Sequence, residues 1–406
     1  MSGSATGSVV VVGAGVGGLA AAIGMAGLGH RVTVLERRVA QERPSGACLG
    51  VQSNAAMALR MLGVAKPVLT AGVPVGEYRL VSWRGRYLAS WSLAEATAQL
   101  GAPSVTVPRA VLMAALRSGV PDEVVRTGAP VAAVDEDATG VTAHLVDGTT
   151  VRGDLLIGAD GLHSTVRAHV VGDRAPTSYA GYDSWRGTAP VSVETVSEGT
   201  ALHVVGAGRS FGAWPLPDGR TYWVATLADP PRTVDLVGEF VTAPPFVGRL
   251  LKATDPDAVL RTPIHDRDPV DTWHTGRVAL LGDAVHPMQP TTGQGGSQAL
   301  LDVLALTAEL RGVDLADAGA LRRSLAAYQT RRGPATEGMV REAREIGRMH
   351  HISSPVATRV RDLVLRATPR RVWQRRTTAR LDELELLSTW QRPSPDRGEP
   401  TWNDTH

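Results

Sequence analysis

The chain has 406 residues, of which 43% are apolar, 20% charged and 4% aromatic, which is the composition of a folded protein with two or three domains. Its single cysteine, Cys48, excludes an internal disulfide, a CxxC redox pair and an iron–sulfur centre. The 42 basic residues almost balance the 40 acidic ones and are spread along the chain, so we expect no nucleic-acid partner.

The sequence carries no signal for export or for crossing a membrane. Its first residues lack the basic segment of a signal peptide. No run of 18 apolar residues is present that would span a bilayer. We therefore expect a cytoplasmic protein without a membrane span.

The first fifty residues have the pattern of a dinucleotide-binding βαβ unit. Ser8–Val12 is a short apolar strand, residues 19–28 favour a helix, and residues 32–35 favour a second strand that ends in Glu36. Between the first strand and the helix lies a glycine-rich turn whose predicted cofactor-binding residues are Gly13, Gly15, Val16, Gly17 and Gly18.

Each part of this unit has a physical role toward a bound nucleotide. Gly13 permits a tight turn, Gly15 lets the backbone approach a pyrophosphate, and Gly18 lets the helix pack closely on the strand. The start of the helix offers unpaired N–H groups to the anion. Glu36 is suited to accept hydrogen bonds from ribose hydroxyls and would repel a ribose phosphate, so the pattern predicts FAD or NAD rather than NADP.

Two later strands also end in a carboxylate. Residues 155–157 precede Asp160, and residues 278–281 precede Gly282 and Asp283. Ligands of open α/β sheets bind at such strand ends, although Asp160 has the alternative of capping the helix that follows. After Asp283 the chain continues through Pro290, Gly293, Gln294, Gly295 and Gly296 into a helix at about 297–310, whose start suits a developing anion.

With these three motifs in this order, from residue 9 to residue 302, the sequence resembles the FAD-dependent aromatic hydroxylases, the single-component flavoprotein monooxygenases related to p-hydroxybenzoate and salicylate hydroxylases. The resemblance implies that the first motif, with Arg37 after Glu36, holds the ADP half of FAD. It places Asp160 near FAD and the nicotinamide cofactor, Asp283 at the ribityl chain and Arg109 at FAD. The chain departs from the usual pattern at Leu301, before Asp302, where relatives carry Glu, and at Gly296 and Ser297.

The resemblance also implies the architecture. We expect an α/β protein with a Rossmann-like FAD-binding domain, an inserted and mostly antiparallel substrate-binding sheet, and C-terminal helices. The predicted ranges are 1–75, 100–175 and 265–345 for the FAD-binding domain, 76–99 and 176–264 for the substrate domain, 346–390 for a helical segment, and 391–406 for a disordered tail.

The reaction that the resemblance implies is insertion of one oxygen atom from O₂ into an aromatic or other electron-rich small molecule through a flavin C4a-hydroperoxide, with NADPH or NADH as reductant. We favour hydroxylation in natural-product biosynthesis. Epoxidation, Baeyer–Villiger oxidation and catabolism of an aromatic acid remain open, as do an FAD dehydrogenase and a flavin-binding protein without turnover. Either a monomer or a homodimer is compatible with the sequence.

Residues 179–228 contain the candidates for substrate contact. Alternation along the strand at 210–215 puts Ser210 and Trp214 on one face, and we predict that they line the pocket together with His203 and Pro290, although packing in the core explains Trp214 equally well. For His203, which is also a candidate base, an exposed strand position is the favoured interpretation. His286 is interpreted as structural or next to the cofactor, and His350 and His351 as surface residues without the spacing of a metal site. The remaining cluster, Arg370, Arg371, Arg375 and Arg376, is predicted to form a solvated helix face, with an anion or partner site as the alternative.

Overall fold

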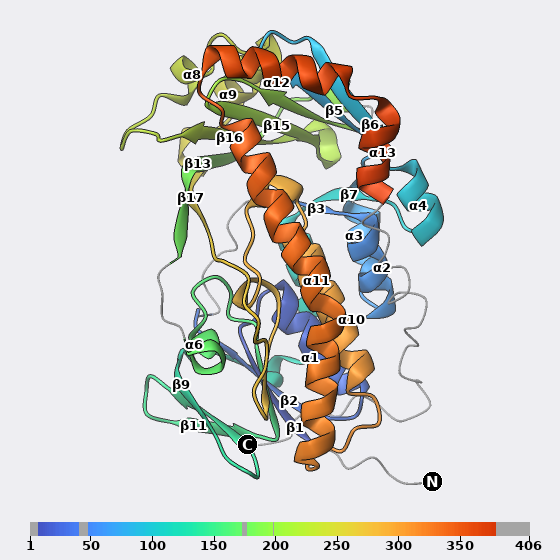
Figure 1. Ribbon diagram of the computed structural model, residues 1–406, viewed down its shortest axis with the longest axis vertical. Helices are drawn as coiled ribbons and strands as arrows, with labels where there is room; N and C mark the ends of the chain where they lie inside the picture. The colour runs from blue at the N-terminus through green and yellow to red at the C-terminus, as the bar shows by residue number, and fades with distance from the viewer. Residues whose placement is uncertain (1–6, 40–47, 173–176, 198, 379–406) are drawn as a thin grey trace.

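The computed structural model describes residues 7–39, 48–172, 177–197 and 199–378, and the predicted tail lies outside these ranges. Two large sheets lie one above the other along the long axis of the molecule, and one long helix runs beside both (Figure 1). Across the described residues, no helix is both long enough and apolar enough to cross a membrane.

The lower sheet in Figure 1 is parallel, with the strand order β18-β12-β1-β2-β8. Its strands are β1 (Ser8–Val12), β2 (Arg31–Glu36), β8 (Val125–Thr127), β12 (Leu155–Gly158) and β18 (Val278–Leu280). The central strands β1 and β12 are almost wholly buried, as expected for a parallel sheet covered on both faces. The sequence predicted β1, β2, β12 and β18, and the structure confirms these four strands. They could be predicted because each is a short apolar run in the local sequence.

Helices and smaller sheets surround the parallel sheet. The helix α1 (Val16–Gly27) packs against α10 (Gly295–Glu309), and both begin inside the glycine-rich turns rather than a few residues after them. The other elements of this half are β3 (Cys48–Val51), α2 (Ser53–Met61), α3 (Ala65–Ala71), β4 (Val73–Pro74), β7 (Val105–Pro108), α5 (Arg109–Arg117), η1 (Asp122–Val124), β9 (Val131–Glu136), β10 (Val141–Leu145), β11 (Thr150–Gly153) and α6 (Thr165–Val171).

The upper sheet has seven strands in the order β17-β13-β16-β15-β14-β5-β6, and all its neighbours are antiparallel except β14 and β5. Its elements are β5 (Glu77–Ser82), β6 (Tyr87–Ser92), β13 (Ser178–Ala189), β14 (Thr200–Val205), β15 (Arg209–Pro215), β16 (Thr221–Ala228) and β17 (Leu260–Asp266), with α4 (Ala94–Leu100), α7 (Glu194–Ser197), η2 (Pro217–Gly219) and η3 (Pro256–Ala258) in its connections. Within this sheet β15 and β16 form a hairpin, since η2 joins these two antiparallel strands.

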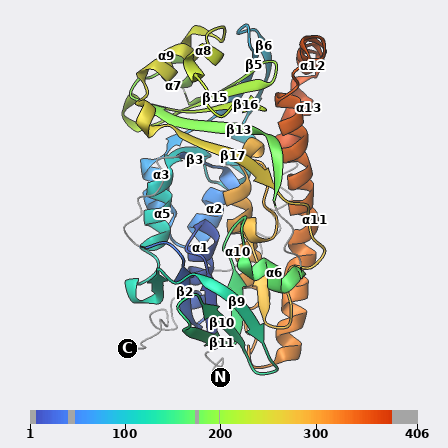
Figure 2. The ribbon, with the colours of Figure 1, turned by 90° about the vertical axis from the view of Figure 1, so that its left-hand side faces the viewer.

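The two faces of the upper sheet have different surroundings. Alternate residues such as Phe211 and Trp223 pack under α8 (Leu236–Glu239) and α9 (Pro245–Ala253) on the outer face (Figure 2). The opposite face, here called the inner face, is turned toward α2, β3 and α10 (Figure 2). It contains Ser210, Gly212 and Trp214 of β15, so the predicted alternation is confirmed.

The helix α11 (Ala318–His350) has 33 residues, continues through Pro334 and links the two halves. Two further helices, α12 (Pro355–Ala367) and α13 (Arg370–Thr378), cross the far end of the upper sheet. Together these elements confirm the predicted fold class, an α/β protein with a Rossmann-like domain, an inserted mostly antiparallel sheet and C-terminal helices.

Candidate functional site

The first glycine-rich turn combines tight packing with an open side. Gly13 has a φ of +102°, and a Cβ at this position would lie 2.5 Å from the carbonyl oxygen of Ala159. A Cβ on Gly18 would lie 1.8 Å from the carbonyl oxygen of Gly13, so only glycine lets β1 and α1 approach this closely. A Cβ on Gly15 would meet no heavy atom within 4 Å. Gly13 and Gly18 therefore serve the fold, while Gly15 faces open space.

The start of α1 borders this open space and has no side-chain cap. The N–H groups of Val16 and Gly17 belong to the first turn of the helix, where no carbonyl of the same helix is in reach and an anion is favoured. Beside them, the Glu36 carboxylate accepts hydrogen bonds from the backbone N–H groups of Ala14 at 2.8 Å and Arg38 at 2.9 Å. Arg37 is exposed at the end of β2. Turn, helix start and carboxylate fit the pyrophosphate and ribose of FAD.

Asp160 lies between β12 and α6 and caps that helix. Its carboxylate accepts hydrogen bonds from the Ser164 hydroxyl and from the backbone N–H groups of Thr165 at 2.7 Å and Val166 at 3.2 Å. Arg167, one turn further, donates to the carbonyl of Val285 at 3.0 Å and so ties α6 to the loop after β18. The structural alternative for Asp160 is present, and the role beside FAD and the nicotinamide stays a prediction.

The loop between β18 and α10 brings the third set of predicted residues to the start of α10, which has no side-chain cap. Gly282 begins the short helix η4 (Gly282–Ala284) with a φ of +59°, and Gly293 ends η5 (Pro290–Thr292) with a φ of +65°. Gln294 is buried and accepts hydrogen bonds from Asn54 at 3.3 Å and Gln298 at 3.4 Å. A Cβ on Gly295 would lie 3.7 Å from Asp283 Oδ1, and a Cβ on Gly296 would meet no heavy atom within 4 Å. The Asp283 carboxylate therefore lies beside the first turn of α10.

Charged side chains from three separate segments meet beside this loop. The Asp283 side chain is exposed to solvent, yet desolvation by the surrounding chain raises its pKa, although His286 and Arg109 lower it. Burial lowers the pKa of Arg109 at the start of α5, and Arg38 and Arg186 lower it further while Asp283 raises it. Arg109 therefore lies within electrostatic reach of Asp283 on the cofactor side and of Arg186 on the inner face of the upper sheet.

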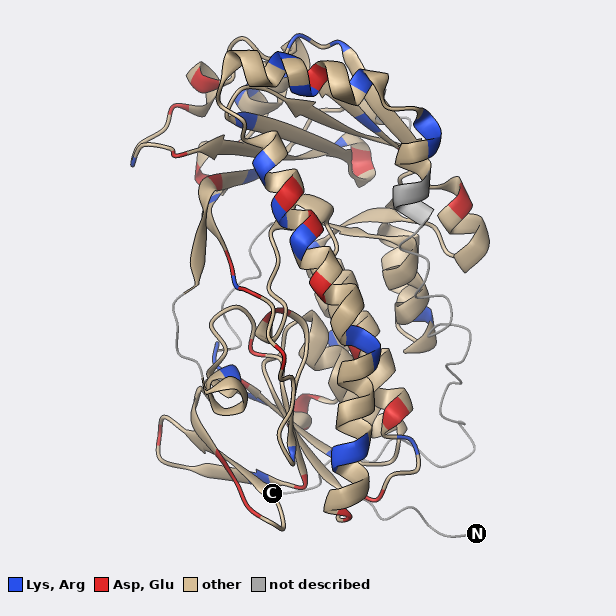
Figure 3. Cartoon of the chain, viewed as in Figure 1, with Lys and Arg blue, Asp and Glu red and all other residues tan. Residues whose placement is uncertain are grey.

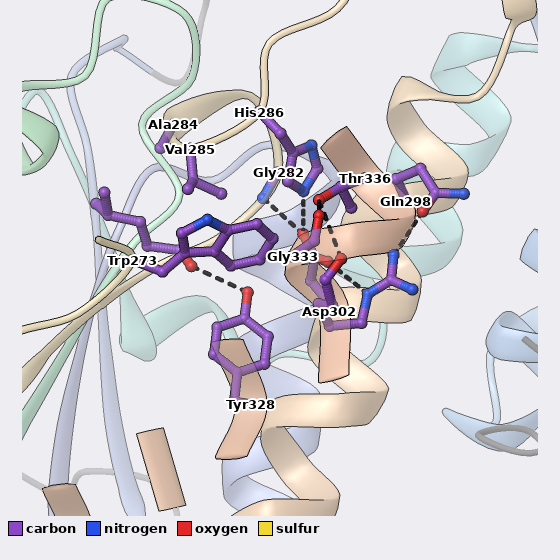
Figure 4. Close-up of polar contacts among 12 residues, drawn as sticks. Trp273, Gly282, Ala284, Val285, His286, Gln298, Asp302, Tyr328, Gly333 and Thr336 are labelled. Atoms are coloured by element: carbon purple, nitrogen blue, oxygen red, sulfur yellow. Dashed lines mark hydrogen bonds and ion pairs between the residues drawn. The ribbon is translucent and has the colours of Figure 1, made fainter. Parts of the chain in front are cut away.

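A buried ion network behind the loop was not expected from the sequence, which marked Asp302 only as following an unusual Leu301. Asp302 accepts hydrogen bonds from the backbone N–H of Gly282 at 2.9 Å, His286 Nε2 at 2.6 Å and Arg332 Nε at 2.9 Å (Figure 4). Burial alone would raise the pKa of Asp302, but His286 and Arg332 outweigh it and hold the pKa at about 2. The network fixes the loop that carries Asp283 to both α10 and α11.

The inner face of the upper sheet carries the predicted substrate residues. A Cβ on Gly212 would lie 2.3 Å from the Trp214 ring and 3.2 Å from His203 Nδ1, so both rings use the space that glycine leaves. Trp214 is half-buried and its ring centre lies 5.8 Å from that of Tyr222. Ser210 is buried and shares a hydrogen bond of 2.7 Å with Thr226, while Pro290 is exposed on η5. Trp214 and His203 are thus better placed than Ser210 to touch a ligand.

Three histidine interpretations from the sequence are wrong. His203 is half-buried rather than exposed, and its ring stacks on His350 with 4.6 Å between centres. His350 is 7% exposed, and His351 stacks on Tyr182 at 3.9 Å and bonds Thr226 through Nε2 at 2.9 Å. The reason is tertiary: the end of α11 packs against the inner face, which the local sequence does not reveal.

Because these histidines are held neutral, we expect the free energy of unfolding to decrease at acidic pH. Burial lowers the pKa of His203 and of His351 to about 4, below the ordinary value of 6.5, so the fold favours the neutral rings. The unfolded chain then binds more protons between pH 6.5 and 4, and the free energy of unfolding falls as the pH falls through that window. We expect His203→Phe to make this fall shallower in urea unfolding at pH 7 and pH 5. The exposed control His163→Phe should leave it unchanged, and an equal effect of both variants would refute the assignment.

Comparison with known proteins agrees with the geometry. A family model described as FAD binding domain matches residues 6–343. The chain is 36% identical over 366 residues to an aurachin C monooxygenase/isomerase from Stigmatella aurantiaca, covering 88% of this chain and 94% of that protein. It is 35% identical over 370 residues to a 3-amino-4-hydroxybenzoate 2-monooxygenase from Streptomyces cremeus, covering 89% and 92%. The structure of Klebsiella pneumoniae HpxO complexed with FAD and uric acid matches with a TM-score of 0.82 at 29% identity, covering 93% and 97%.

These matches extend over both sheets and over all three motifs. They confirm FAD as the cofactor and the enzyme class as a monooxygenase, which sets aside a flavin-binding protein without turnover. The chain belongs to the family of FAD-dependent aromatic hydroxylases.

Proposed function

We propose that the protein is an NAD(P)H-dependent hydroxylase of a small aromatic compound that carries an anionic group, acting in natural-product biosynthesis. The observation that carries the proposal is Arg186. It lies half-buried on the inner face and has no hydrogen-bond or ion-pair partner among the described residues. An arginine in such a position suits a carboxylate or a phenolate, to which a guanidinium binds with two hydrogen bonds.

The surroundings of Arg186 favour an anion in the same way. The neighbouring residues on the inner face of β13 to β16 include no acidic side chain, and the pKa of about 4 keeps His203 uncharged at neutral pH. Two relatives support this substrate class: one is named for 3-amino-4-hydroxybenzoate, an aromatic acid, and the other was solved with uric acid. The excess of arginine over lysine, with only Lys66 and Lys252, favours a GC-rich genome and with it a biosynthetic rather than a catabolic setting.

The residues of this chain divide the task. The first turn with Glu36 would hold the ADP half of FAD, and Asp283 with the start of α10 would hold the flavin end, where the N–H groups suit negative charge. Bound FAD supplies hydride acceptance from NAD(P)H and activation of O₂. Trp214 and Gly212 would position the aromatic ring and Arg186 its anionic group. The neutral His203 would accept a hydrogen bond from a substrate hydroxyl.

The test is turnover with a panel of aromatic acids and their neutral amides, each with NADH and with NADPH. We expect substrate-stimulated nicotinamide oxidation and incorporation of one labelled oxygen atom from ¹⁸O₂. An epoxide as product would instead indicate epoxidation, and a ring-expanded lactone would indicate Baeyer–Villiger oxidation. Oxidation that persists under argon with an artificial acceptor and yields no oxygenated product would refute the proposal.

Arg186→Gln tests the substrate class. We expect KM for the acidic substrate to rise by about ten-fold or more, because a charge-assisted bidentate contact is lost, while KM for the matched neutral amide stays within about two-fold. The flavin absorbance of the purified variant reports whether FAD is retained. Arg84→Gln, which changes an exposed arginine in the turn between β5 and β6, is the matched control. Equal losses with the acid and the amide would contradict anion binding by Arg186.

A further inference from the structure

The outer side of α12 is an apolar stripe that no described element covers. Its residues are Val356, Val360, Leu363 and Val364, which are 68%, 56%, 68% and 57% exposed. Their spacing puts them on one face of the helix. Val372 of α13, 40% exposed, extends the apolar surface past the end of α12. Single exposed apolar residues are ordinary, but a continuous stripe marks an interaction site.

The orientation of this stripe is fixed by the other side of α12. Leu365 is buried against Leu80 and Leu88 of the upper sheet. Arg361 donates to the carbonyl of Gly206 at 2.9 Å and forms an ion pair with Asp362 at 2.8 Å. Because these buried contacts hold one face against the sheet, the apolar stripe must face outward.

The charge around the stripe is positive. Arg359 and Arg366 lie along one edge of it, and Arg371 follows at the start of α13 next to Arg370, which is paired with Glu77 at 3.9 Å. Asp362 is the single acid within the described parts of these two helices, and Arg361 already neutralises it. Figure 3 shows that basic positions outnumber the acidic one along α12 and the coloured part of α13. An occupant of the stripe must therefore combine apolar material with negative charge.

We propose that α12 and the start of α13 form a docking surface for an anionic lipid membrane. The two helices lie at the surface of one end of the molecule, beside the turn between β5 and β6 (Figures 1 and 2). Aliphatic side chains on a convex helix, flanked by arginines, are the features of helices that lie in the plane of a membrane interface. The valines and the leucine would enter the acyl boundary, and the arginines would contact phosphate groups.

A second copy of the chain fits the stripe less well. In an antiparallel pair of α12 helices related by a twofold axis, each edge of one helix lies beside the same edge of the other. Arg359 and Arg366 would then face the Arg366 and Arg359 of the second copy, with no free acid in the described part of either helix to balance them. Like charges in such positions oppose association, whereas an anionic lipid surface attracts them.

The test is sedimentation of the FAD-loaded full-length protein with vesicles of phosphatidylcholine alone or mixed equally with phosphatidylglycerol. We expect binding to the mixed vesicles that weakens as salt is added. Leu363→Glu should lower the partition coefficient by about ten-fold or more, because a charge replaces an aliphatic group that would enter the acyl boundary. Arg359→Gln and Arg366→Gln should each lower it about five-fold.

Val146→Glu is the matched control, since Val146 is 67% exposed between β10 and β11, at the other end of the molecule. It should bind vesicles like the wild type, and flavin absorbance with the melting temperature checks that every variant is folded. Absence of binding to the anionic vesicles overturns the proposal. So does a dimer that Leu363→Glu converts to a monomer, which would assign the stripe to a second copy instead.

Discussion

Replacing Gly15 by alanine is expected to lower the affinity for FAD by about ten-fold or more while leaving the fold intact. The backbone of Gly15 has a φ of −77°, which alanine adopts without strain, and its Cβ would meet no atom of the chain within 4 Å. The added methyl group would instead occupy the place where the pyrophosphate approaches the turn. The cost therefore falls on the cofactor and not on the packing of β1 and α1.

Alanine substitutions at two other glycines distinguish a specific loss of FAD binding at Gly15 from a general effect of replacing glycine by alanine. Gly338→Ala adds the same methyl group at an exposed position of α11 that also has no atom within 4 Å, and it should keep full FAD affinity. Gly18→Ala should unfold the first motif, because its Cβ would lie 1.8 Å from the carbonyl oxygen of Gly13. Titration of the apoprotein with FAD and thermal unfolding without FAD give the two readouts. An unchanged FAD dissociation constant for Gly15→Ala would contradict the assignment of this turn.

Features that lie within one contiguous stretch of the chain could be predicted from the sequence. Strand, turn and helix of the first motif are contiguous, so their spacing alone predicts both the fold of the unit and the type of ligand. The same holds for the strand before Asp283 and the glycine-rich start of α10. Alternation within β15 likewise predicts that Ser210 and Trp214 share a face, because the period of a strand is local.

Contacts between distant segments are a different matter. Asp302 lies on α10 and Arg332 on α11, and the local sequence of neither helix predicts that these two residues pair. The available signal was a lone acid within the apolar run from Ala299 to Leu306, since an acid inside a buried helix requires a partner. His350 and His351 carried no such signal, because their burial depends on where the far end of α11 meets the sheet.

Arg332→Met is expected to be the most destabilising single change in this network. Arg332 is 2% exposed and donates to Asp302 at 2.9 Å, so its removal leaves a buried carboxylate with one cation fewer. Removing one partner of a buried pair costs about 3–5 kcal/mol of the free energy of unfolding. The matched control is Arg331→Met at the adjacent position, where the ion pair with Glu309 is at the surface and contributes at most about 1 kcal/mol.

The dependence of this loss on pH tests the cause. In the folded protein the pKa of Asp302 is about 2, below its ordinary value of 3.8, so the ionised carboxylate stabilises the fold above pH 3.8 and this contribution disappears as the pH falls through about 2. Without Arg332 the pKa of Asp302 must rise, and protonation then relieves the unpaired charge at a higher pH. The deficit of Arg332→Met, measured by urea unfolding, should therefore be largest at neutral pH and shrink toward pH 2. A deficit that stays constant over this range would mean that lost packing, and not the charge of Asp302, is what Arg332 compensates.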